Sequence, residues 1–389
     1  MKAKYLITTA AFAVSAIALT ACTPSTAEAD SESSQTSIAN AAAVETVIED
    51  VDLDALLEAA KDEPALQVYD GTSKIEKIAE NFAEHYGLEI TGSKADSSEV
   101  TEMMIREHAA GNVQGDVFAL SDLAAVNNEL LANGSATAWL PADIAKNMDD
   151  SAINPPVVIN DPSLFAYNAE VNDVCPADNI WEFTDAASGQ RLAFQDPLND
   201  SGTLDWFSQM SQFASDELES SYASYFGEEF TGDDITEEFV AKLASNNPLL
   251  TKSSEEASEA VGAPGQNEPP MGLIASAKFR NNDELGYKLA ACDTLEPFVG
   301  YANPKAIVMA SGTDSPNAAK LFIHWMYTQE GIEPQIADGK ISTNSEIVQP
   351  EDPANVGELT DRIFTFDGSG VDTDWANRED WSDLWRMNS

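Results

Sequence analysis

The chain has 389 residues, of which 43% are hydrophobic, and a formal net charge of −47 at pH 7. A chain of this length can bury a large core, and the length suggests two domains. The excess of 67 acidic over 20 basic residues argues against nucleic acid and anionic membrane surfaces as partners. Because cations are scarce, any basic residues that cluster are informative.

The first 22 residues have the pattern of an export signal. Lys2 and Lys4 form a basic start, residues 5–18 are apolar and small, and Leu19-Thr20-Ala21-Cys22 follows. This ending resembles the lipobox of bacterial lipoproteins, which implies removal of residues 1–21 and lipidation of Cys22. The alternative is an ordinary secretory signal with an incidental cysteine. We expect an exported protein that meets the membrane only through its lipid anchor, since no later segment approaches 18 apolar residues.

Residues 23–50 are rich in Ser, Thr, Ala and Glu without a sustained apolar period, so we expect a flexible tether over 22–50. Helical and strand patterns then alternate. Helices are predicted at 51–63, 74–86 and 98–110, and strands at 65–69, 88–90 and 116–120. This alternation predicts an α/β fold with a mainly parallel sheet covered on both faces. Ligands bind such sheets beyond the carboxyl ends of the strands.

Two strand ends carry polar side chains. Thr72 and Ser73 follow the first strand at a helix start, and Ser121 and Asp122 follow the third. For Ser73 the alternative is a role as helix cap. We expect these residues to line a ligand site, with Asp122 or Ser121 contacting a hydroxyl, an amine or a metal.

The stretch 194–206 predicts a strand end, a turn and a helix start. Ser201, Gly202 and Thr203 stand directly before apolar residues at helical spacing. Glycine lets a ligand approach the backbone, and the free amides and dipole of a helix N-terminus attract anions. This turn is therefore a candidate anion site. On local grounds the alternative is a capped helix with nothing bound.

Five stretches in order resemble the ferric-type solute-binding proteins of ABC importers: residues 59–69, 115–118, 180–185, 191–203 and 315–331. The resemblance runs over about residues 51–345. It implies a type II periplasmic-binding-protein fold, in which two α/β lobes joined by a two-strand hinge close on a ligand. Lobe one is then 51–160 plus 301–389, and lobe two is 161–300. Strand patterns at 155–159, 163–167, 298–301 and 306–310 fit crossings between the lobes.

The chain departs from its ferric-binding relatives at the ligand set. Those proteins usually carry adjacent tyrosines in lobe two, whereas no two of the nine tyrosines here are adjacent. The corresponding stretch, 271–280, offers Ser276, Lys278 and Arg280 instead. An ammonium and a guanidinium suit a phosphate, phosphonate or carboxylate, and other members of the same cluster bind sugar phosphates or aminophosphonates. The alternative is that Lys278 and Arg280 pair with surface acids.

The expected site has two jaws. Lobe two holds the anionic head at its helix start with Lys278 or Ser276 opposite, and lobe one contributes its two strand ends. Tyr301, near the return crossing, lines the cleft or packs in the core. The expected ligand-binding residues are Thr72, Ser73, Ser121, Asp122, Ser201, Gly202, Thr203, Ser276, Lys278, Arg280 and Tyr301.

Three further features bear on structure. Cys175 and Cys292 are the only cysteines left after lipidation, so we expect a disulfide between them in an oxidising exterior. The three histidines are dispersed without metal-ligand spacing, so no metal site or cofactor is expected. Trp381, Leu384 and Trp385 share one helical face, which we expect to pack across the back of lobe one. A partner-docking helix is the alternative.

We therefore expect a monomeric, non-enzymatic protein that captures a small anionic solute by lobe closure and delivers it to an ABC permease. The first alternative is a ferric carrier that uses oxygen ligands and a synergistic anion held at residues 201–203. The second is a secreted hydrolase, although neither a nucleophile elbow nor a phosphate loop occurs in the sequence.

Overall fold

The computed structural model describes residues 45–389, so the expected signal peptide (1–21), Cys22 and the first part of the expected tether lie outside the described residues. The expected end of the tether at residue 50 is too late. Strand β1 (Val47–Glu49) pairs in parallel with β6 (Trp139–Pro141). The Glu49 carboxylate also accepts a hydrogen bond from Trp139 Nε1 at 2.7 Å. These contacts order the backbone before residue 51, although the local composition has no apolar period.

A mixed sheet of 12 strands is the frame of residues 45–389, and its main path runs β3-β2-β4-β12-β7-β10-β8-β9. The outer strands β3, β2 and β4 are parallel, as are β10, β8 and β9. The central pairs β4–β12, β12–β7 and β7–β10 are antiparallel. The expected α/β class with parallel sheet portions is confirmed, and the two parallel blocks meet at an antiparallel centre.

The strands of the main path are β3 (Ile90–Lys94), β2 (Leu66–Asp70), β4 (Val117–Leu120), β12 (Gly300–Ala310), β7 (Val157–Asn168), β10 (Met271–Ala275), β8 (Leu192–Gln195) and β9 (Leu249–Thr251). At its margins β11 (Leu289–Ala291) and β13 (Ile341–Ser342) pair with β7, and β5 (Ala136–Thr137) and β14 (Ile363–Thr365) pair with β12.

The longer helices are α1 (Leu53–Ala60), α2 (Lys74–Tyr86), α3 (Ser97–Ala110), α6 (Ser201–Phe213), α7 (Ser215–Phe226), α8 (Ile235–Ser245), α9 (Ser254–Gly262), α11 (Pro316–Met326), α12 (Gln329–Ile336) and α13 (Val371–Asn388). The short helices are α4 (Leu123–Ala125), α5 (Ala142–Ala145), α10 (Asn281–Glu284) and the π-helical turn η1 (Val126–Leu131). The 3₁₀ turns are η2 (Asp150–Ala152), η3 (Ile180–Thr184), η4 (Ala186–Ser188), η5 (Pro197–Asn199), η6 (Ser276–Arg280), η7 (Val356–Glu358), η8 (Thr360–Arg362) and η9 (Gly368–Gly370).

Helix α2 forms over the residues that its apolar spacing predicts. Ile75, Ile78 and Phe82 recur at helical intervals and are buried. The helix ends at Gly87, whose φ of 71° lies in the left-handed region, and its amide donates to Ala83 O at 2.8 Å. The predicted helix over 74–86 is confirmed at both ends.

The strand predicted at 88–90 is wrong in its extent, because β3 runs from Ile90 to Lys94. Its later residues are polar or glycine, a composition that is typical of a turn. Gly92 is required there, since a Cβ at this position would lie 2.5 Å from Ile75 O of α2. Close helix packing, and not apolar alternation, thus explains the composition of this strand.

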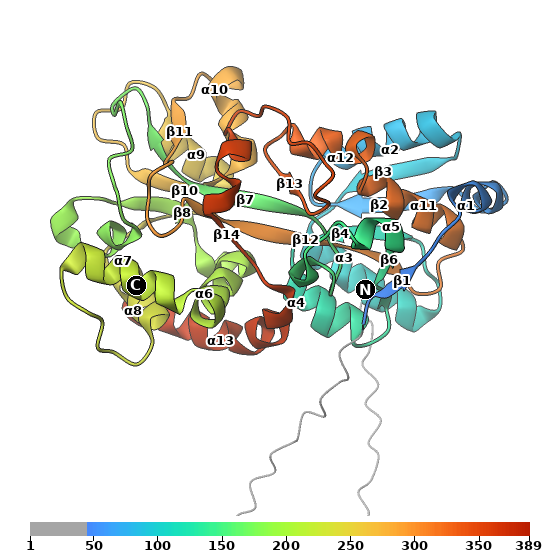
Figure 1. The fold of residues 1–389 in the computed structure, drawn as a ribbon, viewed down its shortest axis with the longest axis horizontal. Helices are drawn as coiled ribbons and strands as arrows, with labels where there is room; N and C mark the ends of the chain where they lie inside the picture. The colour runs from blue at the N-terminus through green and yellow to red at the C-terminus, as the bar shows by residue number, and fades with distance from the viewer. Residues whose placement is uncertain (1–44) are drawn as a thin grey trace, which may run out of the picture. The chain divides into compact units, whose positions relative to one another are not determined.

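Strands β7 and β12 run the whole way between the two parallel blocks (Figure 1). The sequence predicts two short strands in each place, at 155–159 and 163–167 and at 298–301 and 306–310. Each pair is one continuous strand. The polar residues Asn160 and Asp161 interrupt the apolar pattern, yet their backbone still pairs with Pro304 and Asn303 of β12. The ladder therefore continues where the side-chain pattern breaks.

Buried apolar side chains of residues 45–389 form four clusters. Two pack around β2, β4 and the helices near them, and include Phe82, Phe118 and Trp139. The other two pack around β8 and β10, and include Trp181 and Phe279. The parallel blocks thus have separate cores.

Helix α13 packs on α6 and α8, so its expected position on the back of lobe one is wrong (Figure 1). Trp385 lies edge-on to Phe194 at a centroid distance of 5.8 Å, and Trp381 lies 6.1 Å from Phe207. Residues 354–363 also join a cluster with Leu164 and Ile274. The end of the chain therefore shares cores with residues 161–300, because these carry the apolar surface that it covers.

A disulfide joins Cys175 and Cys292, the two cysteines expected to pair. They are 117 residues apart, and Cys292 is buried. In the chain-entropy model, closing a loop of this length stabilises a protein by about 4–5 kcal/mol relative to the reduced chain.

Reduction should therefore lower the free energy of unfolding by up to about 4–5 kcal/mol. The measurement is urea denaturation with and without a phosphine reductant. The double variant Cys175→Ser/Cys292→Ser is the control and should unfold like the reduced wild type, with no response to reductant. An unchanged urea midpoint on complete reduction would contradict the prediction.

Candidate functional site

Two neighbouring cavities open where the parallel blocks meet the antiparallel centre. The first, which we name the basic cavity, has a volume of about 390 Å³ and is lined by Gly71, Thr72, Ser73, Lys74, Lys94, Ser121, Asp161, Ala275, Ala277, Lys278, Arg280, Glu284, Lys305, Asp338 and Lys340. The second, the hydroxyl-lined cavity, has a volume of about 130 Å³ and is lined by Ser121, Asp161, Ser163, Phe194, Gln195, Asp200, Thr203, Ser254, Leu273, Ala275, Tyr301 and Asn303. Because three residues line both cavities, we treat them as compartments of one site.

The floor of the site is the β7–β12 ladder. Ser163 pairs directly with Tyr301, and Asp161 with Asn303. Side chains two residues apart on a strand point to the same face, so Lys305 continues the row of Tyr301 and Asn303. Two strands that read as hinge crossings in the sequence therefore supply residues to both cavities.

The basic cavity gathers cations. Within residues 45–389 it is lined by six of the 20 Lys and Arg residues of the chain: Lys74, Lys94, Lys278, Arg280, Lys305 and Lys340. They come from both parallel blocks as well as from β12 and the segment after α12. In a chain with a net charge of −47, this grouping makes a local field that attracts anions.

Two of these lysines are buried with carboxylate partners. Lys305 Nζ lies 2.6 Å from Asp70 Oδ1, and Lys340 Nζ lies 2.8 Å from Asp161 Oδ2. Burial lowers the pKa of Lys305, and Asp70 offsets only part of that effect. Burial also opposes the charge of Lys340, but Asp161 and Asp70 outweigh it and raise the pKa of Lys340. Removing one member of such a pair would leave an uncompensated buried charge.

The predicted cations Lys278 and Arg280 do line the basic cavity. Each also contacts an acid, as the alternative interpretation held: Lys278 pairs with Glu255 at 2.8 Å and Arg280 with Asp338 at 3.1 Å. Ser276 lines neither cavity, because its side chain is buried and its Oγ donates to Gly339 O at 2.7 Å. The structure thus brings together two of the three polar residues predicted in this stretch.

Of the ligand-binding residues expected in the first parallel block, three line a cavity and one does not. Thr72 and Ser73 line the basic cavity, and Ser121 lines both cavities. Within the described residues Ser73 makes no side-chain capping hydrogen bond to α2. Asp122 lines neither cavity, since its carboxylate caps α4 through the Ala125 amide and pairs with Arg378.

Two of the protein's own carboxylates contact the expected anion turn. Helix α6 begins at Ser201, and Asp200 stands before it with Oδ2 at 2.6 Å from Thr203 Oγ1. Burial raises the pKa of Asp200, and the Thr203 hydroxyl and the amides of Gly202 and Thr203 offset only part of this. Ser201 Oγ donates to Asp122 Oδ2 at 3.0 Å. Carboxylates of the protein therefore contact two of the three residues that the sequence analysis reserved for a bound anion, Ser201 and Thr203.

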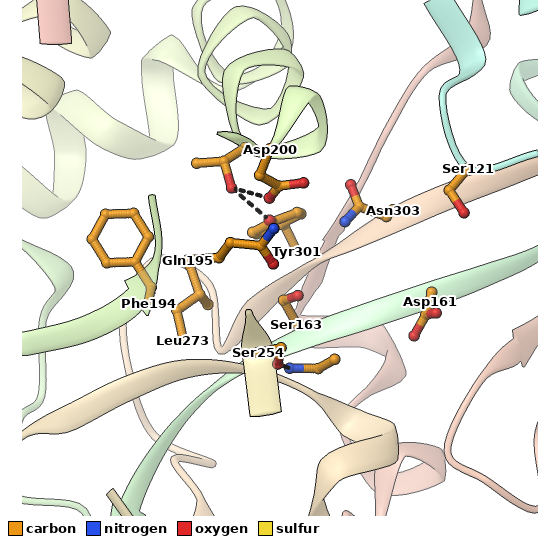
Figure 2. A pocket seen from close by; sticks show the side chains of 12 residues that line it. Ser121, Asp161, Ser163, Phe194, Gln195, Asp200, Ser254, Leu273, Tyr301 and Asn303 are labelled. Carbon is orange, nitrogen blue, oxygen red and sulfur yellow. Dashed lines mark hydrogen bonds between the residues drawn. The ribbon is translucent and has the colours of Figure 1, made fainter. Parts of the chain in front are cut away.

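Tyr301 lies at the centre of the hydroxyl-lined cavity (Figure 2). Its ring is buried and stacks on Trp206 at a centroid distance of 4.7 Å, and its hydroxyl lies 3.3 Å from Thr203 Oγ1. Burial raises the pKa of Tyr301 above its ordinary value, so the phenol stays protonated at neutral pH. Tyr301 therefore both packs in the core and lines the cavity, and it is the only tyrosine among the described residues to line either one.

Sequence reasoning missed Asp161, Asn303, Lys305 and Lys340. A weak signal existed, because Lys305 directly precedes an apolar run in a chain poor in lysine. In the sequence, Asp161 and Asn303 look like breaks between two short predicted strands. Their importance depends on the register of β7 against β12, which the local sequence does not reveal.

Helix α13 links the two parallel blocks through Arg378. Its guanidinium lies 2.6 Å from Asp122, which follows β4, and 2.6 Å from Asp205 of α6. Burial raises the pKa of Asp205 to about 7, against the opposing effect of Arg378. On the same helix, Asp374 Oδ2 accepts a hydrogen bond from Gln209 Nε2 of α6 at 2.6 Å. The two blocks are thus tied together beside the hydroxyl-lined cavity.

The model of the bacterial extracellular solute-binding protein family matches residues 77–360. The chain belongs to this family. Among solved structures, iron-bound HitA from Pseudomonas aeruginosa matches this solute-binding protein with a TM-score of 0.63 and 15% identity, over 84% of this chain and 100% of that chain. AfuA from Actinobacillus pleuropneumoniae with bound fructose-6-phosphate has a TM-score of 0.58 and 16% identity, over 83% and 98%.

IdiA (FutA) from Trichodesmium in complex with iron and citrate matches with a TM-score of 0.62 and 11% identity, over 84% of this chain and 99% of that chain. At such identities these likenesses show the fold alone. A search of curated proteins found no match. The family assignment confirms the expected resemblance and makes this chain an exported solute-binding protein, and these likenesses confirm the expected fold.

Within residues 45–389 of the solute-binding protein, no helix combines the length and apolar character needed to cross a bilayer. The same residues contain no group of three or more His, Cys, Asp or Glu side chains placed to hold a metal ion.

The stability of the solute-binding protein should fall as the pH rises from about 5 to about 8. The pKa values of Asp200 and Asp205 are raised in the folded state, so their contribution is present below the unfolded pKa and is lost as the pH passes the folded pKa, about 7 for Asp205. Carboxyls with lowered pKa, such as Asp161 and Glu255, change only at lower pH.

The measurement is the thermal midpoint across this pH range in about 1 M NaCl, which screens general repulsion between the many surface carboxylates. Asp205→Asn is the matched variant and should flatten the decline. A midpoint that is constant or rises from pH 5 to pH 8 would show that the sign is wrong.

Proposed function

We propose that this solute-binding protein captures a small organic anion outside the cytoplasm and delivers it to the permease of an ABC importer. The observation that carries the proposal is the gathering of six cations around one cavity of a strongly acidic chain. Charge-assisted hydrogen bonds from lysine and arginine are the strong interactions available to phosphate, phosphonate and carboxylate groups. The cavity volume of about 390 Å³ suits a small solute.

The anion site of this proposal joins residues that the sequence predicted to residues that it missed. Lys305 and Lys340 form the buried base of the basic cavity, and Lys278 and Arg280 face it from the second parallel block. At the start of α6 the Asp200 carboxylate accepts a hydrogen bond from the Thr203 hydroxyl and opposes a second anion there. Positive charge on side chains, and not helix amides, is therefore the source of attraction.

Lobe closure is the mechanism that we propose. The two parallel blocks are the lobes, β7 and β12 are the hinge strands, and residues after about 350 belong with lobe two because they share its cores. Lys74 and Thr72 come from lobe one, whereas Lys278 and Arg280 come from lobe two. A solute that contacts both sets favours the closed state, which the permease recognises. Lipidation at Cys22 would hold the monomer at the membrane, and no catalytic step is part of this function.

A ferric carrier is the second candidate, favoured by the fold likeness to iron-bound HitA and to IdiA with iron and citrate. Asp161, Asp200 and Tyr301 would supply its oxygen ligands in the hydroxyl-lined cavity. The first test is native mass spectrometry of freshly purified protein, followed by calorimetry with fructose 6-phosphate and with iron(III) citrate. Binding of the iron complex without binding of any phosphate or phosphonate would overturn the anion proposal.

Lys278→Glu should weaken binding of a phosphate monoester at least tenfold, measured by calorimetry. The change removes a charge-assisted hydrogen bond, an interaction of about 1.5–3 kcal/mol, and adds repulsion. Lys77→Glu is the control, because it makes the same charge change on an exposed residue that pairs with Glu80 outside both cavities. Equal affinities of the two variants would remove Lys278 from the site.

Arg378→Gln should open the ligand-free protein and weaken solute binding. The substitution breaks the link between Asp122 of lobe one and Asp205 of lobe two. The measurement is the radius of gyration by small-angle scattering, together with affinity. Arg386→Gln on the same helix is the control, since Arg386 is exposed and pairs only locally with Asp383. An unchanged radius and affinity in Arg378→Gln would show that this link does not hold the lobes.

A further inference from the structure

We infer that Asp338 is a built-in competitor of the captured anion. Its carboxylate pairs with the Arg280 guanidinium and so joins the two parallel blocks, and a solute binds only after it has displaced this carboxylate. The inference rests on the proposed function and adds to it a control of affinity from within the chain. It is carried by the ion pairs of Asp338, by the contact of the next residue with the second block, and by the place of Asp338 in the lining of the basic cavity.

Asp338 pairs with a cation of each block. It follows α12, which packs in the core of the first block, and its Oδ1 lies 3.6 Å from Nζ of Lys74 at the start of α2. Its Oδ2 lies 3.1 Å from Nη1 of Arg280, at the end of η6 in the second block. The Asp338 side chain is only 9% exposed, so water screens these contacts weakly. The carboxylate thus connects the blocks at the basic cavity.

The residue after Asp338 holds the same turn against the second block. Gly339 O accepts a hydrogen bond from Ser276 Oγ of η6 at 2.7 Å. Gly339 has a φ of 84°, in the left-handed region that favours glycine, and a Cβ at this position would lie 3.1 Å from the Ser276 Cβ. Glycine therefore suits both the turn and its close approach to η6. This approach brings Asp338 to Arg280.

The other carboxylates of the basic cavity are placed differently. Among the described residues, Asp161, Glu284 and Asp338 line this cavity. Asp161 lies on β7 and pairs with Lys340 at 2.8 Å, whereas Glu284 lies 3.8 Å from Arg280 within the second block. Of the three, Asp338 is the one that pairs with a cation of each block. Negative charge in the cavity and a connection between the blocks are thus combined in one residue.

A solute anion needs the same donors. The Arg280 guanidinium and the Lys74 ammonium line the cavity in which we propose that the anion binds. The Asp338 carboxylate beside them repels an incoming anion, which must exchange the existing ion pairs for its own. Because only molecules in which Asp338 has left Arg280 are competent to bind, the apparent affinity is reduced in proportion to their fraction.

The Arg378 link differs from the Asp338 contact in its relation to the solute. Arg378 lines neither cavity, so a solute in the basic cavity leaves its ion pairs with Asp122 and Asp205 intact. Loss of that link removes a contact that the closed protein keeps, whereas loss of the Asp338 contact removes one that the solute breaks. Both changes should open the protein, but they should shift the affinity in opposite directions.

The test measures binding of inorganic phosphate and of fructose 6-phosphate by calorimetry on the folded full-length protein. Asp338→Asn keeps the shape of the side chain and should bind these anions about tenfold more tightly than the wild type, because no charge-assisted contact has to be broken first. Glu284→Gln is the matched control, since it removes one negative charge from the same cavity without touching a contact between the blocks. It should tighten binding by less than about threefold.

Small-angle scattering without added solute is the second measurement. Asp338→Asn should have a larger radius of gyration than the wild type, and Glu284→Gln should have the same radius as the wild type. If Asp338→Asn lacks the circular dichroism spectrum of the wild type, Asp338→Ser takes its place.

Equal gains in affinity for Asp338→Asn and Glu284→Gln would reduce the role of Asp338 to general charge, and weaker binding in Asp338→Asn would make it a positioning residue for Arg280. Either result overturns the inference and leaves the anion proposal standing. An unchanged radius in Asp338→Asn would likewise overturn the connection between the blocks. If neither the wild type nor any folded variant binds either anion, the proposed function itself fails.

Discussion

The site depends on one structural constraint, the antiparallel pairing of β7 with β12. This ladder sets Asp161 opposite Asn303 and Ser163 opposite Tyr301, and it brings Lys305 into the same row. A slip of one residue would turn each of these side chains to the other face of the sheet. The strands also connect the two parallel blocks, so residues that line both cavities lie on the elements that join these blocks.

Buried charge is the second feature that organises the molecule. Lys305 with Asp70 and Lys340 with Asp161 place two ion pairs beneath a cavity in which positive charge prevails. Such pairs are weak contributors to stability, because desolvation opposes their attraction. Their value here is positional, since Asp70 also accepts a hydrogen bond from Gln335 at 3.0 Å and so holds the Lys305 ammonium in place. Among the described residues, six Lys and Arg residues line this cavity against three acidic ones, Asp161, Glu284 and Asp338.

Because basic residues are scarce in this chain, the position of Arg378 on α13 is informative. Arg378 is placed between Asp122 and Asp205 and forms an ion pair with each of these acids from different blocks. This explains why Asp122, a plausible ligand residue in the sequence, is engaged elsewhere. It also connects a helix near the end of the chain to the state of the cleft, because separating the blocks would break the Asp122 contacts with both Arg378 and Ser201.

The sequence alone was enough for the α/β alternation, the solute-binding family and the pairing of Cys175 with Cys292. These follow from local periodicity, short motifs and the scarcity of cysteine, which do not depend on long-range packing. Lys278 and Arg280 could also be found, because basic residues stand out in an acidic chain. Asp161 and Lys340 could not, since their roles arise from strand register and from contacts between distant segments. Only the tertiary structure showed that Asp200 accepts a hydrogen bond from Thr203 at the start of α6, because a helix start looks the same in sequence whether it faces a solute or the chain's own carboxylate.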